Sequence, residues 1–199
     1  MKIIGITGGI GAGKSAVLDY LKERYGAYII QADQVGHALM EPKGSCFLPV
    51  VKLLGKETLD TQGKIDRGKI AALVFPNPQL LAQLNEIIHP AVKQKIREHI
   101  AVQEQEGRSV FVIEAALLIE DHYEEICQEF WYIYAEEAVR RRRLKEQRGY
   151  SEEKITDIFQ SQQTEDVFRR ECSYVVENNG DLQMTYLQID KRMKSYGFM

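Results

Sequence analysis

The feature that most constrains this chain is a glycine-rich stretch near its N-terminus, residues 8–15, which reads Gly-Gly-Ile-Gly-Ala-Gly-Lys-Ser. It follows the phosphate-binding P-loop pattern of Gly, four free positions and then Gly-Lys-Ser. The apolar run at residues 2–7 before it is typical of a buried parallel strand. The apolar residues after it recur at the spacing of one helix face: Val17, Leu18, Leu21 and Tyr25. The motif therefore lies between a strand and a helix N-terminus.

The residue types of this loop suit a polyphosphate. Glycines allow backbone conformations that a Cβ would forbid, so successive N–H groups can turn inward around an anion, and the helix adds its positive end. Lys14 supplies a cation for the β- and γ-phosphates, and the Ser15 hydroxyl is placed to ligate Mg²⁺. By average residue usage the spacing arises by chance in roughly one such chain in a hundred. We therefore expect an ATP site formed by Gly8, Gly9, Ile10, Gly11, Ala12, Gly13, Lys14, Ser15 and Ala16.

Length and composition indicate a single domain with small appended lobes. The chain has 199 residues and a net charge of −3, so no global basic field attracts nucleic acid or an anionic membrane. No apolar run approaches the roughly 18 residues of a membrane span. The three cysteines, Cys46, Cys127 and Cys172, lack metal-site or disulfide spacing, as is typical of reduced thiols. We expect a cytoplasmic protein without nucleic-acid or membrane partners, a monomer by default, although its charged helices leave the oligomeric state open.

Four further segments have the composition of strands, at residues 28–31, 110–113, 130–134 and 174–177. Helical segments separate them, and this alternation predicts an α/β fold of the P-loop NTPase type, with a parallel five-stranded sheet flanked by helices. After the last strand, Asp181 is predicted to cap a final helix. The residues of that helix expected to point inward are Leu182, Tyr186, Ile189 and Met193.

Two acidic residues stand at strand ends. Asp33 follows the second strand, and ligands of open α/β sheets bind at the carboxyl ends of the strands. Asp33 is therefore either a catalytic carboxylate or the N-cap of the next helix, or both. Glu114 ends the third strand in a Walker B-like pattern, in which the carboxylate contacts Mg²⁺ through water. This second pattern is weak by itself, because many buried strands end in an acid.

The sequence between about residues 41 and 107 is helical and returns to no buried strand. The predicted helices cover residues 47–54, 66–75, 79–88 and 91–106, with prolines such as Pro90 between them. A long helical stretch between two strands of one sheet predicts an inserted α-helical lobe at 41–107. Its polar candidates for ligand binding are Arg67, Lys69 and His89, although each alone fits a surface or capping role better.

An arginine-rich helix is predicted after the fourth strand. It places one group of side chains along a single stripe: Arg140, Arg143 and Gln147. A solvated basic helix is the simplest alternative, and a nucleic-acid patch is disfavoured by the pI of about 5.9 and by the absence of interleaved aromatic residues. Beside a polyphosphate site, guanidinium groups that swing over the γ-phosphate are expected. We predict a helix–turn–helix lid at residues 136–165, with its turn at Gly149.

Together these residues resemble the dephospho-coenzyme A kinase family over nearly the whole chain. The segments that carry the resemblance are residues 5–15, 32–33 with 41–44, 65–67 with 74–75, 84–90, 117–120 and 178–180. Their order and spacing identify the family, since no block beyond the phosphate loop is decisive alone. The resemblance implies a P-loop kinase core, a helical coenzyme A lobe and an arginine lid. It also implies ATP and Mg²⁺ as cofactors and dephospho-coenzyme A as the substrate, phosphorylated on its ribose 3′-hydroxyl.

The resemblance assigns roles to particular residues. It implies that Asp33 takes the proton of the 3′-hydroxyl, with Lys14, Arg143 and Arg140 as the other catalytic residues. Arg148 is added to the ATP site, Asp33, Arg67 and His89 are assigned to the substrate, and Ser15 and Glu114 to the metal. The chain departs from the family pattern at Ala116, at Ser173 and at Gln147, where the family tends to have Pro, Asp and Arg. The last departure leaves open which lid arginines reach the phosphates.

Two alternative functions remain open at this point. Another small-molecule P-loop kinase, such as a nucleoside monophosphate kinase, would share the core and differ in the helical lobe. A nucleotide-sensing protein would bind ATP without transferring phosphate. A sensor needs neither the acidic residue at position 33 nor an arginine-rich lid, so both features favour an enzyme.

Overall fold

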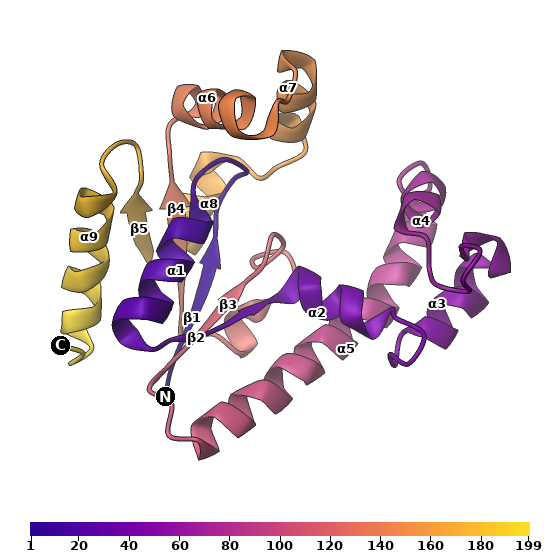
Figure 1. Ribbon diagram of the computed structural model, residues 1–199, viewed down its shortest axis with the longest axis horizontal. Coiled ribbons are helices and arrows are strands. Elements are labelled where there is room, and N and C mark those ends of the chain that lie inside the picture. Colours follow the sequence, from indigo (N-terminus) through magenta and orange to yellow (C-terminus); the bar gives the residue numbers. More distant parts are fainter. The chain divides into compact units, whose positions relative to one another are not determined.

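The fold is a five-stranded parallel sheet flanked by helices, seen in a computed structural model that describes all of residues 1–199 (Figure 1). The strands are β1 (Lys2–Thr7), β2 (Tyr28–Gln31), β3 (Val110–Glu114), β4 (Glu129–Tyr134) and β5 (Tyr174–Glu177). They lie in the order β2-β3-β1-β4-β5. The predicted fold class and all five predicted strands are thus confirmed. None of the helices combines the length and the apolarity that a membrane span requires.

The helices divide between two compact units. They are α1 (Lys14–Tyr25), α2 (Ala32–Leu39), α3 (Phe47–Leu54), α4 (Arg67–Val74), α5 (Pro78–Gln105), α6 (Glu137–Arg148), α7 (Glu152–Gln160), α8 (Glu165–Glu171) and α9 (Leu182–Ser195). The sheet unit comprises residues 1–30 and 103–199, and the helical unit comprises residues 31–102. The helical unit differs in its bounds from the predicted lobe at 41–107 because it includes α2, whose Gly36 lies against Ile88 and Val92 of α5.

Both faces of the sheet are buried. On one face, alternate strand residues such as Ile4, Ile6 and Ile133 form a core that α1 and α9 cover. On the other face, Gly5 leaves room for a large neighbour, since a Cβ there would come within 2.7 Å of the Phe130 ring. Strands that are buried on both faces have continuous apolar sequences, and for this reason their positions could be predicted from the sequence.

Several predicted helix starts are confirmed by side-chain hydrogen bonds. The Asp66 carboxylate accepts from the backbone N–H groups of the first turn of α4. Ser151 accepts from the Lys154 N–H at the start of α7, and Asp181 accepts from the Gln183 N–H at the start of α9. Each cap satisfies a backbone N–H that has no partner within its own helix.

The inward face of α9 differs from the prediction at its first turn. Leu182 is the first residue of α9 and remains 41% exposed, so its predicted inward position is wrong. The stripe that faces the sheet instead runs through Thr185, Ile189 and Met193, all at most 1% exposed. Thr185 is tolerated there because its hydroxyl donates to the Glu177 carbonyl at 3.1 Å. Because threonine is polar, the apolar periodicity of the helix did not predict that Thr185 is buried.

The proline at position 90 does not end a helix, contrary to the prediction of two helices at 79–88 and 91–106. Residues 78–105 form one helix, α5, with Pro90 inside it. The buried residues Leu84, Val92 and Ile96 stay on one stripe across the proline, and Pro90 is exposed on the other side. Burial of one continuous apolar face outweighs the roughly 3 kcal/mol that an interior proline costs.

We predict that Pro90→Ala stabilises the protein. The substitution restores a backbone donor and removes the clash with the carbonyl one turn earlier, so the free energy of unfolding should rise by about 1–3 kcal/mol in urea titrations. Pro78→Ala is the matched control, because Pro78 is the first residue of the same helix, where proline is well tolerated, and should change stability little. Equal effects of the two substitutions would contradict this explanation.

Candidate active site

The phosphate loop packs so closely against two strand ends that only glycine fits at key positions. Gly13 has a φ of 88°, and a Cβ there would collide with the side-chain nitrogen of Asn178, directly after β5. Gly8 has a φ of 149°, and a Cβ there would lie 2.5 Å from the carbonyl oxygen of Ile133 in β4. L-residues with side chains rarely adopt these backbone conformations. The neighbouring strands therefore fix the path of the loop.

The lysine of the loop is held by a carbonyl oxygen and a carboxylate. Lys14 Nζ donates to the Gly8 carbonyl at 2.7 Å and lies 3.7 Å from Oε1 of Glu114. Glu114 ends β3 and is paired in register with Ile6 of β1, just before the loop. Ser15 is exposed in the first turn of α1. A hydroxyl and a carboxylate are oxygen donors of the kind that Mg²⁺ prefers, so these residue types fit the predicted metal ligands.

Arg140 of α6 lies directly against the phosphate loop. Its Nε donates to the Ile10 carbonyl at 2.9 Å, and its guanidinium is 4.1 Å from the centre of the Phe159 ring. The same group presses on Gly9, where a Cβ would collide with it. Burial lowers the pKa of Arg140, but an arginine remains charged at neutral pH. A fixed positive charge therefore lies at the edge of the loop.

Arg143, one turn further along α6, also contacts the loop. Its Nη2 donates to the Asn178 carbonyl at 2.8 Å, and its Nη1 lies 3.3 Å and 3.4 Å from the carbonyl oxygens of Ala12 and Gly11. Burial lowers the pKa of Arg143, and the neighbouring charge of Arg142 lowers it further. The structure thus brings Arg140 and Arg143 to the loop, as the predicted stripe requires.

Arg148 differs from the other two arginines of the predicted site. It is exposed in the last turn of α6 and makes none of the contacts with the loop. Its assignment to ATP remains a prediction from the family resemblance. Arg140 and Arg143 are therefore the better supported pair, and both bond to neutral carbonyl oxygens that leave their charge available to an anion.

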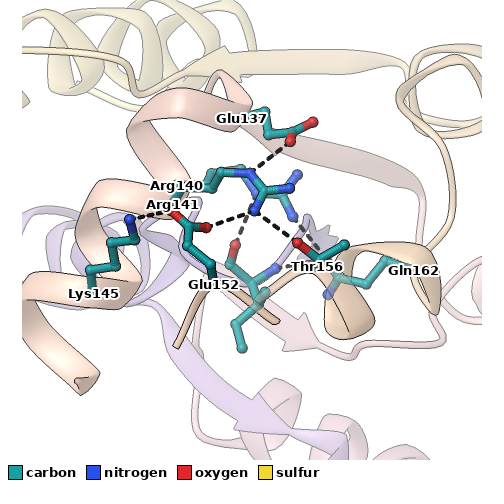
Figure 2. A network of polar contacts seen from close by, with 8 residues as sticks. Glu137, Arg140, Arg141, Lys145, Glu152, Thr156 and Gln162 are labelled. Atoms are coloured by element: carbon teal, nitrogen blue, oxygen red, sulfur yellow. Dashed lines mark hydrogen bonds and ion pairs between the residues drawn. The ribbon is translucent and has the colours of Figure 1, made fainter. Parts of the chain in front are cut away.

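Helices α6 and α7 are joined by a polar seam, as Figure 2 shows. Arg141 donates to Glu137 at 2.7 Å, to Glu152 at 3.1 Å and to the Thr156 hydroxyl at 3.1 Å. Lys145 forms a second ion pair with Glu152. The contacts of Arg141 and Lys145 with Glu152 and Thr156 span the turn at Gly149 and hold the two helices together as the predicted helix–turn–helix. Its role as a lid is a prediction.

Two residues near the loop were missed by the sequence analysis. Asn178 belongs to the segment 178–180 that carries the family resemblance and has no role assigned from the sequence, yet it is 2% exposed and its Nδ2 donates to the Ala12 carbonyl at 2.8 Å. Gln162 accepts a hydrogen bond from the Ile10 N–H at 3.2 Å. Asn178 could have been suspected because it directly follows β5, at the ligand-binding edge of the sheet. Gln162 lies in a connection without any motif.

The helical unit contains the residues predicted to bind the acceptor. Asp33 is exposed and is the second residue of α2, and Gln31 occupies the N-cap position. The N-cap interpretation of Asp33 is therefore wrong, whereas its interpretation as a catalytic carboxylate stays open. His37 lies one helical turn after Asp33 on the same face.

Arg67 and His89 also belong to the helical unit. Arg67 follows the Asp66 cap of α4, and its Nη1 lies 3.0 Å from both ring nitrogens of His37. Since a guanidinium can only donate, an imidazole nitrogen of His37 is the acceptor. His89 is half-buried on α5. Arg67 thus lies beside the helix that carries Asp33.

Comparisons with known proteins agree with the geometry of the loop. A family model described as "Dephospho-CoA kinase" matches residues 2–184. A dephospho-CoA kinase of Dehalococcoides mccartyi is 38% identical over 179 residues, covering 90% of this chain and 89% of the relative. One from Shouchella clausii is 33% identical over 186 residues, covering 94% of each chain.

The chain belongs to the dephospho-CoA kinase family. The match extends from β1 into α9 and confirms the resemblance predicted from the motifs. A solved structure of the dephospho-CoA kinase from Campylobacter jejuni has the same fold, with a TM-score of 0.70 and 21% identity over all of both chains. Membership in this ATP-using kinase family accounts for the phosphate loop.

We predict that Gly13→Ala weakens nucleotide binding. The added Cβ would collide with Asn178 in a backbone conformation that alanine resists, so ATP affinity should fall by at least about tenfold in calorimetry. Gly63→Ala is the control, since Gly63 has a similar φ of 76° but no atom within 4 Å of the added Cβ. Gly63→Ala should leave ATP affinity unchanged, and a Gly13→Ala variant with normal affinity would contradict the prediction.

Proposed function

We propose that this protein transfers the γ-phosphoryl group of ATP to the ribose 3′-hydroxyl of dephospho-coenzyme A, which yields coenzyme A and ADP. The observation that carries the proposal is the family match over residues 2–184, which includes an intact phosphate loop. The three cations found on that loop, Lys14, Arg140 and Arg143, support it further. They form the positively charged cradle that a transferred phosphoryl group needs.

The phosphate loop would bind the donor. Its backbone N–H groups and the N-terminus of α1 surround the triphosphate, and Lys14 turns from the Gly8 carbonyl toward the β- and γ-phosphates. Arg140 and Arg143 then lie beside the γ-phosphate, where negative charge moves during transfer. Because both guanidinium groups are already fixed on the loop, they need little reorganisation when ATP binds.

The predicted metal ligands have oxygen donors of the right kind. Ser15 would bind Mg²⁺ through its hydroxyl, and Glu114 would contact it through water. When bound, Mg²⁺ neutralises part of the negative charge on the β- and γ-phosphates. Glu114 has a second role in this scheme, since its carboxylate holds Lys14 near the loop before the nucleotide arrives.

The helical unit would supply the acceptor side. Asp33 is exposed in the first turn of α2, which directly follows β2, and we propose that it accepts the proton of the 3′-hydroxyl. The acceptor oxygen forms a bond to the γ-phosphorus as the bond to the β–γ bridging oxygen breaks, and ADP leaves. Arg67 and His89 would hold the rest of the substrate. Most of the acceleration then comes from positioning and charge neutralisation, with proton removal adding a smaller factor.

We predict that dephospho-coenzyme A is the preferred acceptor. With MgATP present, an assay coupled to ADP release should give a kcat/KM for dephospho-coenzyme A at least about a hundredfold above that for AMP or another nucleoside monophosphate. The expected reason is that the helical unit binds groups beyond the nucleotide. Equal or greater turnover with a monophosphate would favour the alternative kinase function, and ATP binding without transfer to any acceptor would favour a sensor.

We predict that Asp33→Asn lowers kcat by roughly 10²- to 10⁴-fold with little change in ATP affinity, because the amide cannot accept the hydroxyl proton. Asp19→Asn is the matched control, since Asp19 is exposed on α1 and has no assigned role. It should leave both parameters unchanged. Near-normal turnover of Asp33→Asn would remove Asp33 from the catalytic step.

A further inference from the structure

A side chain outside the phosphate loop fastens Arg140 to it. Gln162 lies between α7 and α8 and is half-buried, whereas the next residue, Gln163, is exposed. Oε1 of Gln162 accepts hydrogen bonds from the Ile10 N–H at 3.2 Å and from Arg140 Nη2 at 2.8 Å (Figure 2). Because both partners are donors, the oxygen of the carboxamide must face them. One oxygen atom of Gln162 therefore binds both the phosphate loop, at Ile10, and the arginine that lies against that loop, Arg140.

Gln162 completes the enclosure of the Arg140 guanidinium. The Ile10 carbonyl accepts from its Nε, the Phe159 ring stacks on it, and Gly9 lies against it. The Gln162 oxygen accepts from Nη2 and adds a second hydrogen-bond acceptor to these contacts. A guanidinium that is held at this many points keeps one orientation before the nucleotide binds, and such preorganisation is what makes a charge effective in a transition state.

The groups that hold Arg140 are all neutral. The two carboxylates whose charge reaches Arg140 form their ion pairs elsewhere, since Glu137 pairs with Arg141 and Glu165 pairs with Arg169. Arg140 therefore keeps its full positive charge for an anionic ligand. A carboxylate at position 162 would accept the same two hydrogen bonds with nearly the same shape. It would also form an ion pair with Arg140 and place a negative charge beside the phosphate loop.

We propose that Gln162 is a positioning residue for phosphoryl transfer, whose neutral carboxamide holds Arg140 against the phosphate loop without neutralising its charge. The inference rests on the proposed role of Arg140 toward the transferred phosphate. It assigns Gln162 no contact with the reacting atoms. Position 162 requires an amide. Alanine would remove the hydrogen-bond acceptor that supports Arg140, and glutamate would neutralise the charge of Arg140.

Two substitutions at position 162 separate this role from a purely structural one. Gln162→Ala should lower kcat by about tenfold, the effect expected when a hydrogen bond to a charged group is lost. Gln162→Glu should lower kcat by about a hundredfold, because it also neutralises the cation. If Gln162 has a purely structural role, Gln162→Glu should retain a higher kcat than Gln162→Ala, because glutamate has nearly the same shape and is a stronger hydrogen-bond acceptor. A Gln162→Glu variant with activity above that of Gln162→Ala would overturn the proposal.

The control for the charge change is Gln163→Glu, which alters the net charge equally on the exposed neighbouring residue. It should leave kcat within about twofold of the unmodified protein, because an exposed charge is well screened. Thermal unfolding of the three variants checks that each is folded. If Gln163→Glu lowered kcat as much as Gln162→Glu does, the proposal would also be overturned, because the loss of kcat would then not depend on contact with Arg140.

A double-mutant cycle tests whether Gln162 acts through Arg140. Arg140→Ala alone should lower kcat, and adding Gln162→Ala should lower it little further; additive losses would overturn the proposal. If Arg140→Ala unfolds, Arg140→Lys takes its place in the cycle. Loss of activity in the Arg140 variant with normal activity in both Gln162 variants would refute the role of Gln162 alone. Normal activity in the Arg140 variant would refute the proposed role of Arg140 and the inference with it.

Discussion

The site depends on the way neutral oxygen atoms hold its two arginines. Arg140 donates to the Ile10 carbonyl and Arg143 to the Asn178 carbonyl, whereas Lys14 donates to the Gly8 carbonyl and also lies 3.7 Å from the Glu114 carboxylate. A carbonyl oxygen fixes the direction of a cation but does not cancel its charge, whereas a carboxylate would do both. The two guanidinium groups can therefore stay close together beside the loop and remain available to a triphosphate.

The sheet supplies the rigidity that this arrangement requires. The loop leaves β1 and is pressed against Ile133 of β4 and Asn178 after β5, so there is no room for a Cβ at Gly8 or Gly13. The Thr185 hydroxyl of α9 lies 3.1 Å from the side-chain oxygen of Asn178 as well as from the Glu177 carbonyl, between which its single proton is shared. Because the sheet is buried on both faces, the positions of these strand ends are set by core packing. The geometry of the site is thus a consequence of the apolar core beneath it.

Much of the fold was predictable, because buried strands and capped helices leave periodic or local signals in the sequence. Pro90 was misinterpreted because the propensity of one residue was given more weight than the apolar stripe on either side of it. Gln162 was missed because it acts through bonds to distant backbone and side-chain groups, which no spacing reveals. Asn178 bonds to a distant backbone group in the same way, and only its place directly after β5 gives a signal. Asp33 shows a further limit, because its position in the first turn of a helix does not establish a catalytic role.

The central claim is tested most directly by a crystal structure with ADP, Mg²⁺, a beryllium fluoride mimic of the γ-phosphoryl group and dephospho-coenzyme A. The account predicts that Lys14, Arg140 and Arg143 each lie within hydrogen-bond distance of the phosphate oxygens or of the mimic, while Asp33 faces the ribose 3′-hydroxyl. Arginines that remain bound only to loop carbonyls and point away from the mimic would contradict it, as would an Asp33 carboxylate far from the hydroxyl.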